Sequence, residues 1–297
     1  MRIVITGAGG RLGAVMASEL QQSGHHVTAL TRSELDITNP PSVHAAIGRL
    51  EPDAIVNCCA YNAVDAAEAD PAAAFAVNAH GPAALADAAA HAGAVLVHFS
   101  SDFVVDGEAP EPYAEDAPAH PLNVYGASKL AGEHQVQRLG EHYILRVESL
   151  FGGPMLTGKT ATIDFIADNL AAGLPVRAMV DRTVSPSYVD DVVRACRALL
   201  EREAPFGTYH CVTSGCTTWY ELACEAARCL GTAAPVLPVR SNDFVAPAAR
   251  PRFCAMSNRK LRALGIEMLS WRAALARHLA ARRTLTHAAQ GLRAQIA

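Results

Sequence analysis

Short apolar segments alternate with alanine-rich helical stretches through the first half of the chain, and this alternation constrains the fold most. Nearly continuous apolar runs predict strands buried on both faces, as in a parallel sheet. They are Arg2–Thr6, His26–Thr31, Asp53–Cys58, Ala94–Ser101 and His142–Val147. Helical patterns lie between them, at about Arg11–Gln22, Pro41–Leu50, Asp65–His91 and Asn123–Leu139. The alternation predicts an α/β fold with a doubly wound parallel sheet.

After about Phe151 the pattern changes. Helices are expected near Thr162–Ala172, Val189–Leu200 and Thr218–Leu230, short strands near Pro175–Val180 and Thr208–Val212, and a loop over Ala233–Pro251. We therefore expect a nucleotide-binding Rossmann domain over residues 1–150. Residues 151–297 should form a smaller α/β part that is mainly substrate-binding, with elements at about 189–212 returning to the sheet.

Composition excludes several classes of protein. Of the 297 residues, 51% are hydrophobic, which excludes a disordered chain, and a net charge of −4 gives no footprint for nucleic acid or an anionic membrane. No apolar run approaches the ~20 residues of a membrane span, and the start of the chain lacks a signal peptide's pattern. We expect a cytoplasmic protein. The eight cysteines have no CxxC spacing, so reduced, packed thiols are expected.

A glycine-rich turn directly follows the first predicted strand. Gly7, Gly10 and Gly13 form a GxxGxxG pattern that opens the first helix, with Arg11 and Leu12 between the last two glycines. Such glycines permit a tight turn, backbone approach to a pyrophosphate, and close packing of helix on strand. The segment therefore predicts dinucleotide binding.

The end of the second strand distinguishes NADP from NAD. An acidic residue there would bind the adenosine 2′-hydroxyl of NAD, but the sequence has Thr31 followed by Arg32. A guanidinium, with Arg11 as a second one, suits a 2′-phosphate. NADP(H) is therefore the expected cofactor, and use of NAD(H) stays open; a merely solvated Arg32 is the alternative.

A Tyr-x-x-x-Lys pattern lies on a predicted helix. Tyr125 and Lys129 are about one turn apart, so the phenol and the ammonium share a face. We expect the cation to lower the pKa of the phenol and to make it a proton donor for a carbonyl oxygen. Ser101 ends the fourth predicted strand, where its hydroxyl could polarise the same carbonyl. The three residues predict a carbonyl reductase.

The chain resembles the extended short-chain dehydrogenases/reductases, and specifically the dTDP-4-dehydrorhamnose reductase family, over nearly its whole length. Segments that carry the resemblance are Leu35–Thr38, Pro52–Tyr61, Ala63–Asp65, Ala67–Glu68, Val77–Ala79, Phe99–Gly107, Pro121–Glu133, Ser185–Ser187, Thr217–Trp219 and Arg250–Pro251. Phe99–Gly107 is similar to the family's STDYVFDG motif.

The resemblance implies roles for individual residues. Tyr125 is the general acid, Lys129 holds the nicotinamide ribose, and Ser101 stands where the family usually has threonine. The implied cofactor contacts are Asp36 and Ile37 at the adenine, Cys59, Ala60 and Tyr61 along the ribose and diphosphate, and Ser100 near the nicotinamide. Asn62, Val64, Phe103 and Arg250 border the sugar. Hydride would pass to the C4 keto carbon of a nucleotide-linked deoxysugar.

The sequence also departs from the family pattern. Where the family continues Arg-Thr-Ser-Trp after the fifth strand, this chain has Glu148 and Ser149 in the last two places, which we include among the substrate residues. Phe103 replaces a tyrosine, and Val15 replaces an acidic residue that contributes to a magnesium-bridged dimer in some relatives. We therefore expect no metal and a substrate other than dTDP-4-dehydrorhamnose itself. Glu148 could contact substrate or pair with an arginine.

Two other functions remain open at this point. The resemblance extends to the regulatory subunit of methionine adenosyltransferase, which would make the chain a non-catalytic NADP-binding partner. The other possibility is a sugar-nucleotide epimerase that keeps its NAD tightly bound. An intact Ser101, Tyr125 and Lys129 set favours an enzyme. The expected partners are a small nucleotide sugar or a similar ketone and a second copy of the chain in a homodimer, with neither nucleic acid nor membrane.

Overall fold

The computed structural model describes residues 1–154 and 160–296, with side chains through residue 284. Six parallel strands form one sheet in the order β2-β1-β3-β4-β5-β8. Their bounds are β1 Arg2–Thr6, β2 His26–Leu30, β3 Ala54–Asn57, β4 Val95–Ser101, β5 His142–Val147 and β8 Gly207–His210. The predicted parallel sheet is confirmed, and the strand order reverses direction beside β1 and β3, where such folds bind ligands.

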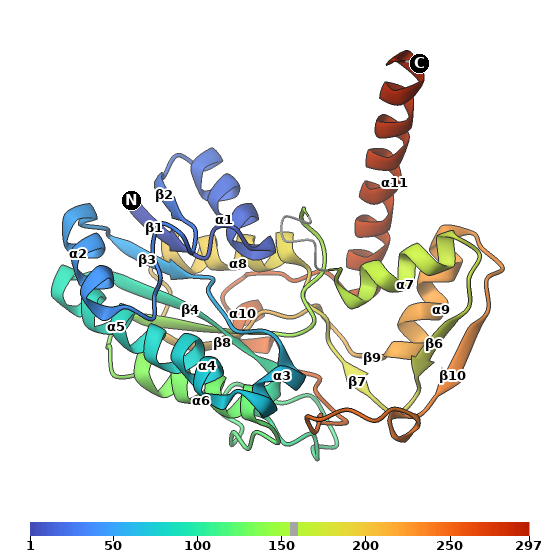
Figure 1. Cartoon of the computed structure of the whole chain (residues 1–297), viewed down its shortest axis with the longest axis horizontal. Coiled ribbons are helices and arrows are strands. Elements are labelled where there is room, and N and C mark those ends of the chain that lie inside the picture. The colour runs from blue at the N-terminus through green and yellow to red at the C-terminus, as the bar shows by residue number, and fades with distance from the viewer. Residues whose placement is uncertain (155–159, 297) are drawn as a thin grey trace.

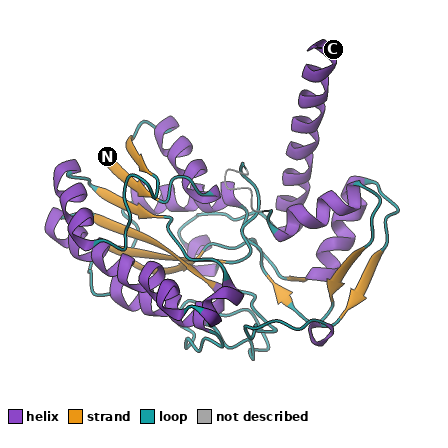
Figure 2. Ribbon diagram, viewed as in Figure 1, coloured by secondary structure: helices purple, strands orange, loops and turns teal. Residues whose placement is uncertain are grey.

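Helices cover both faces of the sheet (Figure 1 and Figure 2). On one face lie α1 Arg11–Gln22 and α8 Val189–Glu201, and on the other lie α2 Pro40–Leu50, α5 Gly81–Ala92 and α6 Val124–Val136. Their apolar side chains and the two faces of the strands form two separate cores, one around Met16 and Val192 and one around Ile47 and Leu85. Burial of β1, β3, β4 and β5 on both faces explains why their sequences are almost continuously apolar.

The segment expected as one helix over Asp65–His91 is divided in the structure. It consists of α3 Val64–Ala69, α4 Pro71–Phe75, a π-helical segment at Ala76–His80, and α5. The break falls where the side chain of Asp70 caps α4 and Pro71 follows it, because proline cannot continue the preceding helix.

The second part lies at the carboxyl end of the sheet (Figure 1). It contains α7 Thr162–Ala171, α9 Trp219–Leu230, α11 Trp271–Ile296 and a parallel pair of strands, β6 Val176–Met179 and β10 Val236–Val239. A shorter pair, β7 Thr183–Val184 and β9 Thr217–Thr218, is antiparallel, and α10 Arg259–Ala263 packs near β8. The expected loop over Ala233–Pro251 is wrong in part, because it contains β10 and the 3-10 turn Ser241–Asp243.

Candidate active site

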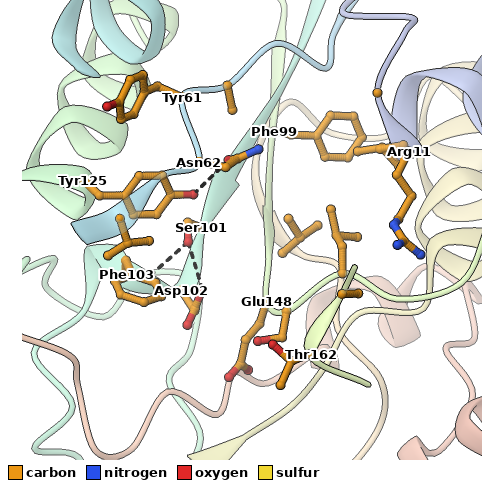
Figure 3. Close-up of a pocket in the computed structure, with 18 of the residues that line it drawn as sticks. Arg11, Tyr61, Asn62, Phe99, Ser101, Asp102, Phe103, Tyr125, Glu148 and Thr162 are labelled. Atoms are coloured by element: carbon orange, nitrogen blue, oxygen red, sulfur yellow. Dashed lines mark hydrogen bonds between the residues drawn. The ribbon is translucent and has the colours of Figure 1, made fainter. Parts of the chain in front are cut away.

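A cavity of about 950 Å³ lies between the carboxyl-end rim of the sheet and the second part. Every predicted site residue except Thr31 lines it, from Gly7 at one end to Arg250 at the other. Figure 3 shows Tyr125, Ser101 and Asn62 on one wall, Arg11 on the opposite side, and Glu148 below. The structure thus brings the residues of all three predicted sets to one place.

The glycine turn between β1 and α1 is built to admit an anion. Gly7 has a φ of 73°, and a Cβ there would lie 2.8 Å from the backbone nitrogen of Cys59. A Cβ at Gly13 would lie 2.9 Å from the Cα of Ala8, so only glycine lets α1 pack this closely on the turn. The N-terminus of α1 has neither a capping side chain nor an acidic residue in its first turn, which leaves its N–H groups and dipole free for a phosphate.

The side chain of Arg11 points from this turn toward the second part. Its guanidinium donates to the carbonyl oxygen of Gly152 at 2.7 Å and to Asp164 Oδ2 at 3.0 Å. Arg11 lines the cavity, but these two partners fix it across the seam between the two parts. Its contribution to a 2′-phosphate site stays a prediction.

At the end of β2, Arg32 and Thr31 differ in their surroundings. The side chain of Arg32 is 87% exposed at the cavity, and its Nε lies 4.0 Å from Asp36 Oδ2. Thr31 instead donates from its backbone N–H and its hydroxyl to Glu34 Oε2, at 2.8 and 2.7 Å. The structure therefore leaves Arg32, rather than Thr31, facing the cavity; Glu34, which the sequence did not single out, is engaged within its own turn.

Tyr125 and Ser101 meet at the centre of the cavity wall. Tyr125 lies on the first turn of α6 and is 7% exposed. The side chain of Asn123 caps this turn and accepts from the Gly126 N–H at 2.7 Å. The Tyr125 hydroxyl donates to Asn62 Oδ1 at 3.5 Å (Figure 3). Burial raises the pKa of Tyr125 to about 12, although a hydrogen bond with Ser101 opposes the rise.

Lys129 lies one turn further along α6 and is 1% exposed. Its ammonium donates to the carbonyl oxygen of Phe99 at 2.6 Å, and burial lowers its pKa to about 8, against the charge of Glu133. The expected lowering of the Tyr125 pKa is not found, because desolvation of the phenol and the charge of Asp102 raise that pKa. A buried phenol that keeps its proton can still serve as an acid.

The π-helical segment holds the far wall of the cavity in place. It directs Asn78, whose amide bridges the N–H and the carbonyl oxygen of Tyr61, at 2.8 and 3.1 Å, and donates to Ser128 on α6 at 2.9 Å. Such segments often occur at functional sites. Here the segment fixes Tyr61 and the neighbouring chain relative to Tyr125.

The side chain of Glu148 lines the cavity and is held by Ser185, and its contact with substrate stays a prediction. It is 1% exposed, and its Oε2 accepts from the N–H of Ser185 at 2.6 Å and from its hydroxyl at 3.1 Å. Arg146, the nearest arginine in sequence, forms a two-bond ion pair with Glu133 at 2.7 and 2.8 Å. Ser149 beside it lines the cavity in a left-handed conformation, with a φ of 43°.

Two more predicted residues, Arg250 and Phe103, line the cavity near Tyr125. Arg250 donates to both carboxylate oxygens of Asp65, at 2.7 and 2.9 Å, and so holds the segment before Pro251 against α3. The ring of Phe103 contacts Tyr125 edge to face, with centroids 5.4 Å apart.

Several cavity residues were missed from the sequence. They are Asp102 on the sheet side and, from the second part, Phe165, Arg177, Arg182 and Trp219. Asp102 is next to Ser101 in the Phe99–Gly107 motif, and this position could have identified it as a site residue. The other four come from separate elements without a shared spacing, and no local pattern could have grouped them.

The dinucleotide cradle and the hydroxyl–ammonium set share one rim of a parallel sheet, and this combination defines a nicotinamide-dependent short-chain dehydrogenase/reductase. Within that class, a model of the family described as RmlD substrate binding domain matches residues 1–284, and the chain belongs to this family. The resemblance inferred from the motifs is confirmed.

Individual relatives agree with this assignment. The chain is 39% identical over 284 residues to a dTDP-4-dehydrorhamnose reductase of Streptomyces griseus, covering 92% of this chain and 91% of that protein. It is 34% identical to a dTDP-4-keto-6-deoxy-D-glucose reductase of Streptomyces niveus, covering 92% and 95%. The structure of a Bacillus anthracis dTDP-4-dehydrorhamnose reductase in complex with NADP superposes with a TM-score of 0.88 at 33% identity, covering 93% and 98%.

Proposed function

We propose that the chain is an NADPH-dependent reductase of the C4 keto group of a nucleotide-linked 6-deoxysugar. The observation that carries the proposal is the meeting of Ser101, Tyr125 and Lys129 in the cavity that also contains the glycine turn. The relatives named above act on thymidine-diphosphate-linked keto sugars, and this sets the substrate class. Cytoplasmic location and a homodimer stay predictions.

The residues of the chain divide the work of carbonyl reduction. Tyr125 keeps its proton through neutral pH and delivers it to the carbonyl oxygen, while Ser101 donates a hydrogen bond to the same oxygen. Lys129, held on the carbonyl oxygen of Phe99, places a positive charge behind the phenol that stabilises it as the proton leaves.

The residues present fit a phosphorylated dinucleotide. The uncapped N-terminus of α1 and the glycine turn would hold the pyrophosphate, Arg32 the 2′-phosphate, and Lys129 the nicotinamide ribose. NADPH, when bound, supplies the hydride. Asn62, Val64, Phe103 and Ser149 would then face the sugar, where serine in place of the family's tryptophan leaves room for a bulkier or more polar substituent.

The proposal is tested by mixing the protein, NADPH and a panel of nucleotide-linked 4-keto sugars, and following NADPH absorbance. Turnover is expected, and Tyr125→Phe should lower kcat by about 10²- to 10⁴-fold while NADPH binding, measured by fluorescence, is retained. Val245→Ala, at a fully exposed side chain outside the cavity, is the control. Retained turnover in Tyr125→Phe would contradict the assignment of the acid. No turnover, with a partner protein recovered in stoichiometric amount, would favour a regulatory subunit.

A further inference from the structure

Two buried carboxyl groups lie close together, and one of them is hydrogen-bonded to Ser101. The hydroxyl of Ser101 donates to Asp102 Oδ1 at 2.8 Å, and Glu148 lies beneath Asp102 (Figure 3). Asp102 is 4% exposed and Glu148 is 1% exposed. One carboxylate oxygen of each, together with the Cys254 thiol, lies within 4.8 Å of the others.

Two negative charges are not tolerated at this separation in a buried site, so the pair retains a proton. Burial raises the pKa of Asp102 to about 6, and burial together with the charge of Asp102 raises the pKa of Glu148 well above its usual value. At neutral pH the proton therefore resides on Glu148, and Asp102 is ionised.

The groups that face the pair come from several elements. Arg182, in the turn before β7, favours the ionised form of both carboxyls. The charge of Asp102 raises the pKa of Tyr125, and the charge of Glu148 raises the pKa of Cys216. Cys254 is a neutral thiol, because burial and both carboxyls raise its pKa well above the usual value. The charge balance of the cluster is thus set by one arginine and the two acids.

The hydrogen bonds of Glu148 identify the oxygen that holds its proton. Oε2 accepts from both the N–H and the hydroxyl of Ser185, whereas Oε1 is buried without a hydrogen-bond partner. An oxygen that already accepts two donors favours negative charge, so the proton belongs on Oε1.

This arrangement conflicts with the role of Ser101 in reduction. While its hydrogen points to an ionised Asp102, Ser101 cannot donate to the substrate carbonyl. If Asp102 carries the proton instead, its O–H donates to Ser101 Oγ, and the serine hydrogen turns to the carbonyl. Donors linked in this way strengthen one another.

We propose that Asp102 and Glu148 are positioning residues that share one proton and so set the direction of the Ser101 hydroxyl. The inference rests on the proposed reduction. As negative charge develops on the substrate oxygen, one proton leaves Glu148 and binds to Asp102, whose carboxylate has an oxygen within 4.8 Å of one of Glu148. No proton is gained or lost by the pair. Its negative charge moves to Glu148, where Ser185 and Arg182 stabilise it.

Glu148→Gln tests the proposal, because an amide has the same shape but no proton to transfer. We expect kcat of the variant to fall roughly 10- to 100-fold above about pH 6, where Asp102 is ionised, and to recover below it, where solvent protonates Asp102. The wild-type protein should show no such change between about pH 5.5 and about pH 7.5. The kcat of Asp102→Asn should also show no change near pH 6, because the asparagine amide donates to Ser101 at every pH.

The matched control is Glu225→Gln, which removes a carboxylate paired with Arg228 on α9, away from the cavity. If Glu148→Gln lowers kcat equally at all pH values, Glu148 has only a packing role and the inference is overturned. Unchanged kcat in Glu148→Gln would also overturn it. So would a change of kcat near pH 6 in Asp102→Asn. Infrared spectra at about pH 7.5 should contain a protonated-carboxyl band that Glu148→Gln lacks. This readout decides the protonation of Glu148 even if no keto sugar is turned over.

Discussion

At the residue scale, burial moves the pKa values of Tyr125 and Lys129 in opposite directions. It raises the pKa of the phenol to about 12 and lowers the pKa of the ammonium to about 8, because in both cases burial disfavours the charged form. The phenol consequently stays protonated across the working range, as a proton donor must. Lys129, in contrast, loses its charge as the pH rises through about 8.

The pH dependence of turnover should therefore have an upper limit set by Lys129. We expect kcat/KM, which reports the free enzyme, to decrease as the pH rises through about 8, since the ammonium is then lost. NADPH oxidation measured from about pH 6 to about pH 10 checks this. In Lys129→Arg, whose guanidinium stays charged, the activity should be lower but the decrease near pH 8 should be absent. If the decrease near pH 8 is unchanged in Lys129→Arg, the decrease belongs to another titrating group.

The sequence identified Ser101, Tyr125 and Lys129 because a strand end and one helix turn place them by local spacing alone. It could not give the direction of the Tyr125 shift, which depends on how completely the folded cavity removes water from the phenol. Nor could it pair Asp102 with Glu148. Those residues follow different strands, and only the register of β4 on β5 brings their side chains together.

At the element scale, α6 carries both catalytic side chains and is fixed by its close approach to neighbouring backbone. A Cβ at Gly132 would overlap the carbonyl oxygen of Asn78 in the π-helical segment, and one at Gly126 would lie 3.0 Å from the carbonyl carbon of Phe103. Backbone cannot yield as a flexible side chain can. The position of Lys129 between these two glycines therefore depends on the absence of side chains on either side of it.

Gly132→Ala should destabilise the protein by about 1–3 kcal/mol, because overlap with Asn78 exceeds the gain in helix propensity. Urea denaturation followed by circular dichroism measures the free energy of unfolding. Gly48→Ala is the matched control, since Gly48 lies within α2 and nothing is within 4 Å of the place that an added methyl group would take. That variant should be stabilised by up to about 1 kcal/mol. Equal effects in the two variants would argue against the close approach.

Element prediction succeeded where burial imposes a pattern and failed where it does not. The four inner strands of the sheet, β1, β3, β4 and β5, are buried on both faces or nearly so, and their apolar runs predict them. The edge strands β2 and β8 are partly exposed. β10, in contrast, is half exposed, contains Pro238, and pairs only with β6, about sixty residues earlier in the chain. Its sequence has no alternation to distinguish a strand from a proline-rich loop.

At the scale of the whole molecule, the cavity depends on how the second part is held against the sheet. Asp164 on α7 is 1% exposed and accepts from Arg11 of the glycine turn at 3.0 Å, from His278 at 2.7 Å and from Arg282 at 2.7 Å. A single carboxylate thus joins the first turn of α1 to α7 and α11. Burial favours its neutral form, but the hydrogen bond from His278 and the guanidinium groups of Arg11 and Arg282 lower its pKa from 3.8 to about 2.

A lowered pKa in the folded state gives stability that is present above the unfolded value of 3.8 and is lost as the pH falls through about 2. The shift corresponds to at most about 2 kcal/mol at neutral pH. Asp164→Asn should therefore lower the free energy of unfolding by about 2 kcal/mol at pH 7, and its difference from wild type should shrink between about pH 4 and about pH 2.

The comparison that separates this seam from ordinary surface charge is Asp168→Asn. Asp168 shares Arg282 with Asp164, but its side chain is 56% exposed, so its removal should cost less than about 1 kcal/mol. Because Arg11 belongs to the glycine turn, Asp164→Asn should also weaken NADPH binding several-fold, whereas Asp168→Asn should not. Chemical denaturation and NADPH fluorescence titration of the two variants measure both effects. Equal stability losses would mean that Asp164 acts as one more surface charge and not as the joint between the two parts.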